Sequence, residues 1–303
     1  MTAMAIANPT SPIPTPAVEP VPVSRWKRRA RVALEGTPIV AVHLAALGAI
    51  WTGVTPAAAM VCLVATLVRT FGITAGYHRY FAHRTFKTSR PFQFVLAVLS
   101  LSAGQRGVLW WAAHHRAHHK HTDEVGDPHS PRVRGVWYSH MGWLFDLEST
   151  ATHLDRVKDL SRFPELRWLE RFWYAPIVAL AAVILAVWGW SGFFVGFCLS
   201  TVIVWQSTFL VNSLSHIVGT RRFETTDDSR NNWFVALLTF GEGWHNNHHA
   251  YQSSCRQGFR WWELDLTFYI LKALSWVGLV WDLREPPARL LGKDKPSAGE
   301  LDA

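Results

Sequence analysis

The sequence predicts an all-α integral membrane protein, in which four transmembrane helices carry a histidine-rich helical cap on the cytoplasmic side. Of the 303 residues, 49% are hydrophobic, only 17% are charged and 17 are tryptophan. That composition is poor in charge and rich in aromatic residues for a soluble domain. Four apolar runs have the length of a membrane span. Ten of the fifteen histidines crowd into three short segments, 78–83, 114–121 and 245–249.

The two ends of the chain read as tails. Residues 1–24 contain six prolines and no strong apolar pattern, so we expect a disordered segment. No apolar core follows a basic start there, which distinguishes it from a signal peptide. A basic collar at 25–31 completes a tail of residues 1–36. We expect one folded domain over 37–285 and a flexible tail over 286–303.

The four apolar runs cover roughly 38–54, 57–75, 173–190 and 192–214. A helix needs about 20 residues to cross the hydrocarbon layer, with a range near 17–25. None of the 30 Lys and Arg residues lies within 32–68 or 172–220. By the positive-inside rule, both termini and the long central segment are therefore predicted to be cytoplasmic.

Two further apolar stretches are not predicted to cross. The stretch 91–112 contains Gln105 and Arg106, which a crossing would bury, and an odd number of crossings would place the C-terminal part outside. We expect a helix or hairpin at the membrane interface or buried in protein. The stretch 257–282 is amphipathic with several tryptophans and is expected to be interfacial.

This topology brings nine histidines to one membrane face. The pattern His-x-x-His-His occurs at 115–119 and at 245–249, and positions i, i+3 and i+4 share a face of a helix. Each box is thus expected to aim three imidazoles at one point. The spacing of five between His78 and His83 suits a helix end. The pair Asn212 and His216 has i, i+4 spacing on the fourth span. The candidate metal ligands are His78, His83, His115, His118, His119, Asn212, His216, His245, His248 and His249.

Nine imidazoles are too many for one ion and suit two ions with an open position. Imidazole binds Zn, Cu, Fe or Ni, whereas Ca and Mg prefer oxygen ligands. The Glu-x-x-His pattern of carboxylate-rich di-iron bundles and the His-Glu-x-x-His of zinc proteases are absent from the sequence. For the remaining histidines ordinary structural roles are favoured, with His129 near the metals through a 127–129 turn, and His43 and His153 as bystanders.

With these motifs in place, the sequence resembles the membrane fatty-acid desaturases of the acyl-CoA delta-9 (stearoyl-CoA) type, and bacterial members in particular. The resemblance covers about 37–285. It is carried by segments 76–83, 115–120, 127–129, 139–143, 212–216 and 241–249. It implies a mushroom shape with four spans and a cytoplasmic cap. It also implies two irons held by the nine histidines, Asn212 reaching one iron through a water, and O2 as co-substrate.

The resemblance further implies a bent tunnel for the acyl chain, with Gln105, Trp111 and Thr208 at its kink. The sequence departs from the acyl-CoA members where they contact the headgroup. An Arg-Asp pair is replaced by Ala113 and His114, a tryptophan beside the tunnel by Phe209, and an asparagine by Arg106. Arg106 and His114 are the candidate headgroup contacts here.

The sequence therefore predicts an O2-dependent desaturase that puts a cis double bond at the delta-9 position of an acyl-CoA. No His-Pro-Gly-Gly haem motif occurs, so electrons are expected from a separate ferredoxin or cytochrome b5-like protein with its reductase. The alternatives are an acyl-lipid desaturase and a membrane hydroxylase with the same ligands. A metal transporter would need ligands within the spans, which hold almost none. Nucleic-acid binding is excluded because the basic residues follow the membrane face.

Overall fold

The computed structural model describes residues 25–292. The α-helices, in chain order, are α1 (Arg25–Ala46), α2 (Ala49–Thr52), α3 (Pro56–Phe71), α4 (Arg90–Leu101), α5 (Val108–His121), α6 (Pro131–Arg134), α7 (Val136–His140), α8 (Lys158–Ser161), α9 (Pro164–Arg171), α10 (Ala175–Ser191), α11 (Ser200–Ser213), α12 (Trp233–Leu238), α13 (His245–Ala250), α14 (Leu266–Trp276) and α15 (Ala288–Gly292).

Two π-helical segments extend the long helices, and 3-10 turns and a small sheet fill the connections. The π-helical segments are η1 (Gly72–Ala82), which continues α3, and η5 (Gly192–Leu199), which leads into α11. The 3-10 turns are η2 (Gly142–Phe145), η3 (Leu147–Thr150), η4 (Leu154–Val157) and η6 (Leu214–His216). Strand β1 (Lys87–Thr88) pairs antiparallel with β2 (Val280–Trp281), with Lys87 opposite Trp281.

Three helical segments are long and apolar enough to cross a membrane: Val32–Thr52, Pro56–Ala82 and Ala175–His216. The third has 42 residues, roughly 63 Å at 1.5 Å per residue and about twice the hydrocarbon thickness. It breaks at Gly189, which has φ 63° and ψ −159°. A Cβ on Gly196 would lie 3.5 Å from Ile184 Cγ2, so the arms on either side of the break pack together as a hairpin.

The ends of the folded part differ from the expected domain limits. Helix α1 begins at Arg25, so the basic collar is helical and not part of a tail; residues 1–24 lie outside the described part of the chain. Helix α15 falls within the segment expected to be a flexible tail. It is held because Leu290 is buried beside Phe223 and Phe259, and because Arg222 donates to the Leu290 carbonyl at 2.8 Å.

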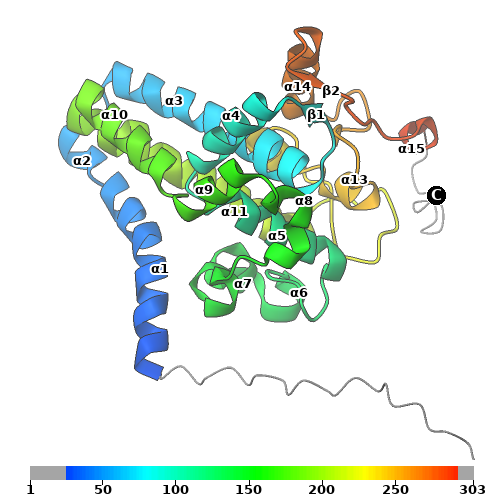
Figure 1. The fold of residues 1–303 in the computed structure, drawn as a ribbon, viewed down its shortest axis with the longest axis horizontal. Helices are drawn as coiled ribbons and strands as arrows, with labels where there is room; N and C mark the ends of the chain where they lie inside the picture. Colours follow the sequence, from blue (N-terminus) through cyan, green and yellow to red (C-terminus); the bar gives the residue numbers. More distant parts are fainter. Residues whose placement is uncertain (1–24, 293–303) are drawn as a thin grey trace, which may run out of the picture.

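The apolar stretch 91–112 forms a bend between two helices. Helix α4 has only 12 residues, about 18 Å, which is too short for a crossing. The chain then turns through Gly104 and Arg106, which have φ of 70° and 66°, before α5 begins at Val108. Both helices pack on η1, and every residue of η1 is buried. Figure 1 shows α1, α3 and α10 leaving a common end near α2, with α5 and α13 lying beyond the far end of α3.

Candidate metal centre

The π-helical form of η1 places His78 and His83 together. A π-helix closes i to i+5 hydrogen bonds, and the His83 N–H donates to the His78 carbonyl at 3.1 Å. Residues five apart therefore lie one turn apart on the same face. The sequence spacing suggested a helix end, and His83 does cap η1, but it is the wider turn that aligns the two imidazoles.

The sequence suggested that each His-x-x-His-His box aims its three imidazoles at one point, and the structure shows that this is wrong. The nine histidines form two groups, and each box contributes to both. The first group is His78, His83, His115, His119 and His248; the second is His118, His216, His245 and His249. In each box the i and i+4 members stay together and the i+3 member joins the other group. At about 100° per residue, i+3 and i+4 point about 100° apart, so a single helix can serve two metals.

The nitrogen atoms in each group have the spacing of ligands around an ion. All ligand atoms of a group lie within 4.8 Å of one another. Neighbouring Nε2 atoms are 2.8 Å apart for His83 and His115, 3.0 Å for His115 and His119, and 3.1 Å for His216 and His245. Two nitrogens about 2.1 Å from one ion and at right angles would be about 3.0 Å apart. Nine imidazoles in this arrangement fit a pair of transition-metal ions.

Unpartnered nitrogens support the same conclusion. The Nε2 atoms of His118 and His249 are buried and have no hydrogen-bond partner in the described residues. The Nδ1 atoms of the same rings donate to Asp127 at 2.9 Å and to Asp227 at 2.8 Å. A carboxylate on Nδ1 leaves the Nε2 lone pair for a metal. Buried polar atoms rarely remain unsatisfied, so these two nitrogens are suited to bind metal ions.

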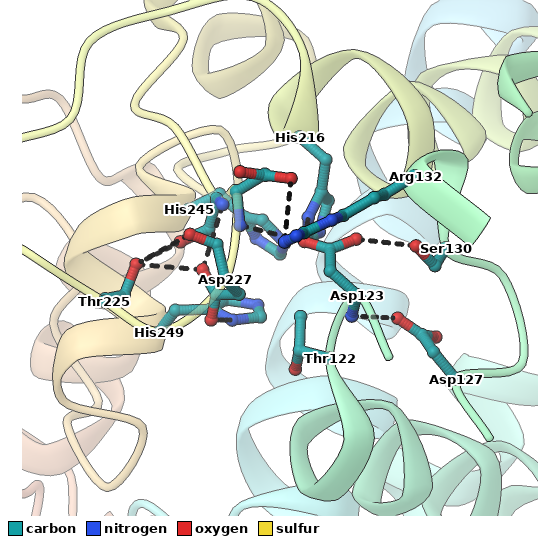
Figure 2. Close-up of polar contacts among 12 residues, drawn as sticks. Thr122, Asp123, Asp127, Ser130, Arg132, His216, Thr225, Asp227, His245 and His249 are labelled. Atoms are coloured by element: carbon teal, nitrogen blue, oxygen red, sulfur yellow. Dashed lines mark hydrogen bonds and ion pairs between the residues drawn. The ribbon is translucent and has the colours of Figure 1, made fainter. Parts of the chain in front are cut away.

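Carboxylates accept hydrogen bonds from the Nδ1 atoms of four of the nine rings. Besides Asp127 and Asp227, Asp123 accepts from His216 Nδ1 at 2.9 Å, and Glu242 accepts from His78 Nδ1. Figure 2 shows Asp123 beside His216 and Asp227 beside His249. The sequence pointed only to the 127–129 turn. Asp123 and Glu242 lie within four residues of a box and could have been noticed, whereas Asp227 lies 22 residues from His249 and carries no local signal.

Opposing charges set the protonation of these groups. Burial alone would raise the pKa of Asp123, but the hydrogen bond from His216 and its charge lower it to about 2. Burial would also raise the pKa values of Asp127 and Asp227, but His118 and His249 respectively hold them well below the usual range. Burial lowers the pKa of four rings of the first group and two of the second: His83, His115, His119, His248, His245 and His249. Metal binding requires neutral imidazole ligands, so the lowered pKa values of these six rings favour it.

A buried arginine links η1 to the C-terminal part of the chain. Arg79 is fully buried and forms ion pairs with Glu242 at 3.0 Å and Asp265 at 2.9 Å. Gln257 donates to Glu242 at 3.0 Å. Glu242 therefore connects Arg79 to His78, and the network holds the first group of histidines against segment 240–265.

A cavity of about 510 Å³ reaches the metal centre at His115. Its lining includes every residue predicted for the tunnel and the headgroup, together with Asn212: Gln105, Arg106, Trp111, His114, Thr208 and Phe209. Trp111 stacks on His115 with ring centroids 4.8 Å apart and donates to Gln105 Oε1 at 3.2 Å. Burial lowers the pKa of His114 to about 4, so its ring is neutral at neutral pH.

A second cavity, of about 430 Å³, meets the first histidine group from another direction. It is lined by His83 and His119 together with Ala82, Arg116, Lys120, Gln252 and Ser253. His115 borders the first cavity and His83 the second. The first group of histidines thus borders both an apolar cavity and one lined mainly by charged and polar residues.

Other histidines, for which the sequence favoured ordinary structural roles, lie outside the two groups. His129 stacks on His118 at 4.5 Å and borders the first cavity. His43 and His140, away from both groups, are joined through Gln206, at 3.0 Å to His43 Nε2 and 2.8 Å to His140 Nε2. His153 lies near His114, with ring centroids 5.8 Å apart.

Comparisons with known proteins agree with this geometry. The family model described as fatty acid desaturase matches residues 54–277. The chain is 41% identical over 219 residues to an acyl-CoA 5-desaturase of Anemone leveillei, covering 71% of this chain and 68% of the relative. It is 40% identical over 232 residues to an sn-1 stearoyl-lipid 9-desaturase of Synechocystis sp., covering 76% and 73%. It is 35% identical over 242 residues to an sn-2 palmitoyl-lipid 9-desaturase of Nostoc sp., covering 78% and 85%.

Proposed function

We propose that this chain, which belongs to the fatty acid desaturase family, is an O2-dependent desaturase that introduces a cis double bond into a saturated fatty-acyl chain at a two-iron centre. The observation that carries the proposal is the pair of histidine groups with a cavity ending at His115. The identity of the metal rests on the family and on the donor set, since imidazole-only sites suit iron among few other ions.

Iron and O2 would supply the oxidant that removes hydrogen from an unactivated methylene pair, which lies beyond any side-chain acid or base. The first group of histidines would hold one iron and the second group the other, with Asn212 one helical turn before His216. Asp123, Asp127, Asp227 and Glu242 would keep their rings in the metal-binding tautomer.

The cavity walls would hold the acyl chain beside His115 and exclude water. Trp111 and Thr208 border it near the metal centre, and a fixed wall converts the choice of methylene pair into a matter of geometry. We propose the delta-9 position. Two of the three relatives are named for position 9 and one for position 5. The position of the double bond would depend on the distance between the anchored end of the acyl chain and the irons.

The long segments suit four crossings, with the Ala175–His216 hairpin counted as two and both termini and the metal centre on the cytoplasmic side. The positive-inside rule supports this orientation. Electrons would come from a separate ferredoxin or cytochrome b5-like protein with its reductase. The sequence favoured acyl-CoA as substrate, whereas the relatives' names divide between acyl-CoA and acyl-lipid.

Lipid analysis of cells with and without the protein tests the activity. Cells that express the chain should accumulate a monounsaturated acyl chain with the double bond at position 9. Cells that express His118→Ala should not, because one iron loses a ligand, while His153→Ala should resemble the wild type. A hydroxylated product would contradict desaturation and indicate the related hydroxylase chemistry.

Metal content tests the cofactor separately. Protein purified under iron-replete conditions should contain two irons per chain by elemental analysis. Stoichiometric zinc, with no activity after iron loading, would reject the proposed two-iron centre.

A further inference from the structure

We infer that the acyl chain enters the cavity sideways from the bilayer, through a portal between α1 and α10, and that the substrate is the acyl group of a membrane glycerolipid. The inference rests on the proposed function and names the substrate class of the same site. It differs from the acyl-CoA expectation, in which the carrier stays in water and only the tail enters.

The portal is formed by two helices that η5 separates. Both α1 and α10 pack on η5, and α1 also packs on α11. The cavity nevertheless takes lining residues from both helices: Pro38, Ile39 and Val42 of α1, and Ile177, Val178 and Ala181 of α10. Phe193 and Phe197 of η5 close the space between them. In Figure 1, α1 and α10 diverge with distance from α2.

Residues at the portal belong to the cavity and to the outer surface at once. Val178 lines the cavity and is 59% exposed, and Tyr174 lines it and is 50% exposed. Tyr174 immediately precedes α10, and Val178 lies one turn further along. In the proposed topology α10 starts at the cytoplasmic interface, so the opening covers the interface and the first turns of the inner leaflet.

The chemistry of the portal suits an acyl chain and an ester rather than a polyanionic carrier. Its walls are mainly aliphatic and aromatic. Among the described residues that line the cavity, Arg106 is the one Lys or Arg side chain, and its guanidinium lies 5.1 Å over the Trp110 ring. A coenzyme A headgroup carries several phosphate charges, which proteins usually meet with several cations.

Two neutral donors in the lining remain for an acceptor. Gln105 Nε2 and Trp143 Nε1 are buried and have no hydrogen-bond partner in the described residues. Buried donors of this kind are costly to leave unpaired. A neutral acceptor would satisfy such a donor without bringing a charge.

The test separates lipid entry from catalysis. The full-length, iron-loaded protein is reconstituted in vesicles that contain phosphatidylcholine with a photoreactive stearoyl chain, and the crosslinked residues are mapped. We expect crosslinks within 38–42 and 174–181. Val178→Trp should reduce crosslinking inside the cavity about tenfold, the order of effect seen when an apolar pocket is altered. Val183→Trp is the matched control, because Val183 is also exposed on α10, at 56%, but does not line the cavity.

Turnover is then measured with stearoyl phosphatidylcholine and with stearoyl-CoA, each supplied with the same reductase. Desaturation of the phospholipid that falls in Val178→Trp and not in Val183→Trp supports the portal. Desaturation of stearoyl-CoA alone, or crosslinking that Val178→Trp leaves unchanged, overturns it while the desaturase proposal stands. Crosslinks at the portal without turnover of either substrate support lipid entry and reject the desaturase proposal instead.

Discussion

Asp227 shows how single side chains hold the metal centre in shape. One oxygen accepts from His249 Nδ1 at 2.8 Å, and the other accepts from Thr225 Oγ1 and from the Ser229 N–H, each at 2.9 Å. Every group that contacts this carboxylate is thus a hydrogen-bond donor (Figure 2). Its position is fixed by its own loop, and the imidazole follows it.

Asp227→Asn should weaken iron binding by about 10- to 100-fold, the usual cost of losing a partner of a ligand. An amide can face His249 with its oxygen only by turning its NH2 towards the donors from Thr225 and Ser229. Iron content measured against a graded chelator would show the loss.

Asp228→Asn is the matched control, because Asp228 pairs with the exposed Arg132 at 3.7 Å and its side chain is 36% exposed. Its iron content should equal that of the wild type. Equal iron content in both variants would show that Asp227 does not hold His249.

At the scale of elements, α5 is positioned by a carboxylate from another helix. The N-cap residue of α5 is Gly107, which has no side chain to satisfy the free N–H groups. Glu170 of α9 does so instead, accepting from Leu109 N at 2.9 Å and Trp110 N at 3.2 Å, as well as from Thr152 Oγ1 at 2.8 Å. A negative charge at this end also suits the helix dipole. Since α5 carries three of the nine histidines, Glu170 sets their depth.

Glu170→Gln should lower the free energy of unfolding by about 1 kcal/mol, as loss of a helix cap does. The amide replaces one accepting oxygen by a donor that faces an N–H group. Thermal unfolding in detergent, followed by tryptophan fluorescence, would measure the change.

Glu165→Gln on the same helix is the control. Glu165 pairs with Arg90 at 2.6 Å, but that arginine side chain is 61% exposed. Exposed ion pairs contribute little, so this variant should unfold near the wild-type temperature. A larger effect at Glu165 than at Glu170 would contradict the capping role.

At the scale of the whole molecule, the proposed topology has an even number of crossings. Helix α4 is too short to cross, and the Ala175–His216 segment doubles back at Gly189. Two cavities then reach the first histidine group from different sides, an apolar one at His115 and a polar one at His83 and His119. The arrangement separates the cavity proposed for the acyl chain from the space lined by charged and polar side chains.

Reporters fused before Met1 and after Ala303 should both be active in the cytoplasm, because the basic residues flank the apolar runs on one side. Paired fusions of a cytoplasm-active and an exterior-active enzyme would measure this. A C-terminal reporter active only outside would indicate a fifth crossing and contradict the short length of α4.

The family resemblance found in the sequence is confirmed. Many features of the fold and of the metal centre could be predicted from the sequence because they depend on local properties. Apolar length, charge asymmetry and the spacing of histidines are local properties, and they follow from helix pitch and bilayer thickness. They selected nine histidines that the fold brings into two groups, and the resemblance selected residues such as Gln105 and Trp111 that line one cavity.

Tertiary structure alone decided how the nine histidines are divided between the two groups. Box spacing cannot say that His118 leaves His115 and His119 to join His216, because the partner comes from a helix about 100 residues away. The π-helical turn at His78 and the pairing of Asp227 with His249 likewise depend on how distant segments pack. The cavity takes lining residues from both α1 and α10 because both helices pack on η5. Helix pitch acts within a few residues, whereas ligand sharing and cavity shape are set by contacts between segments far apart in the chain.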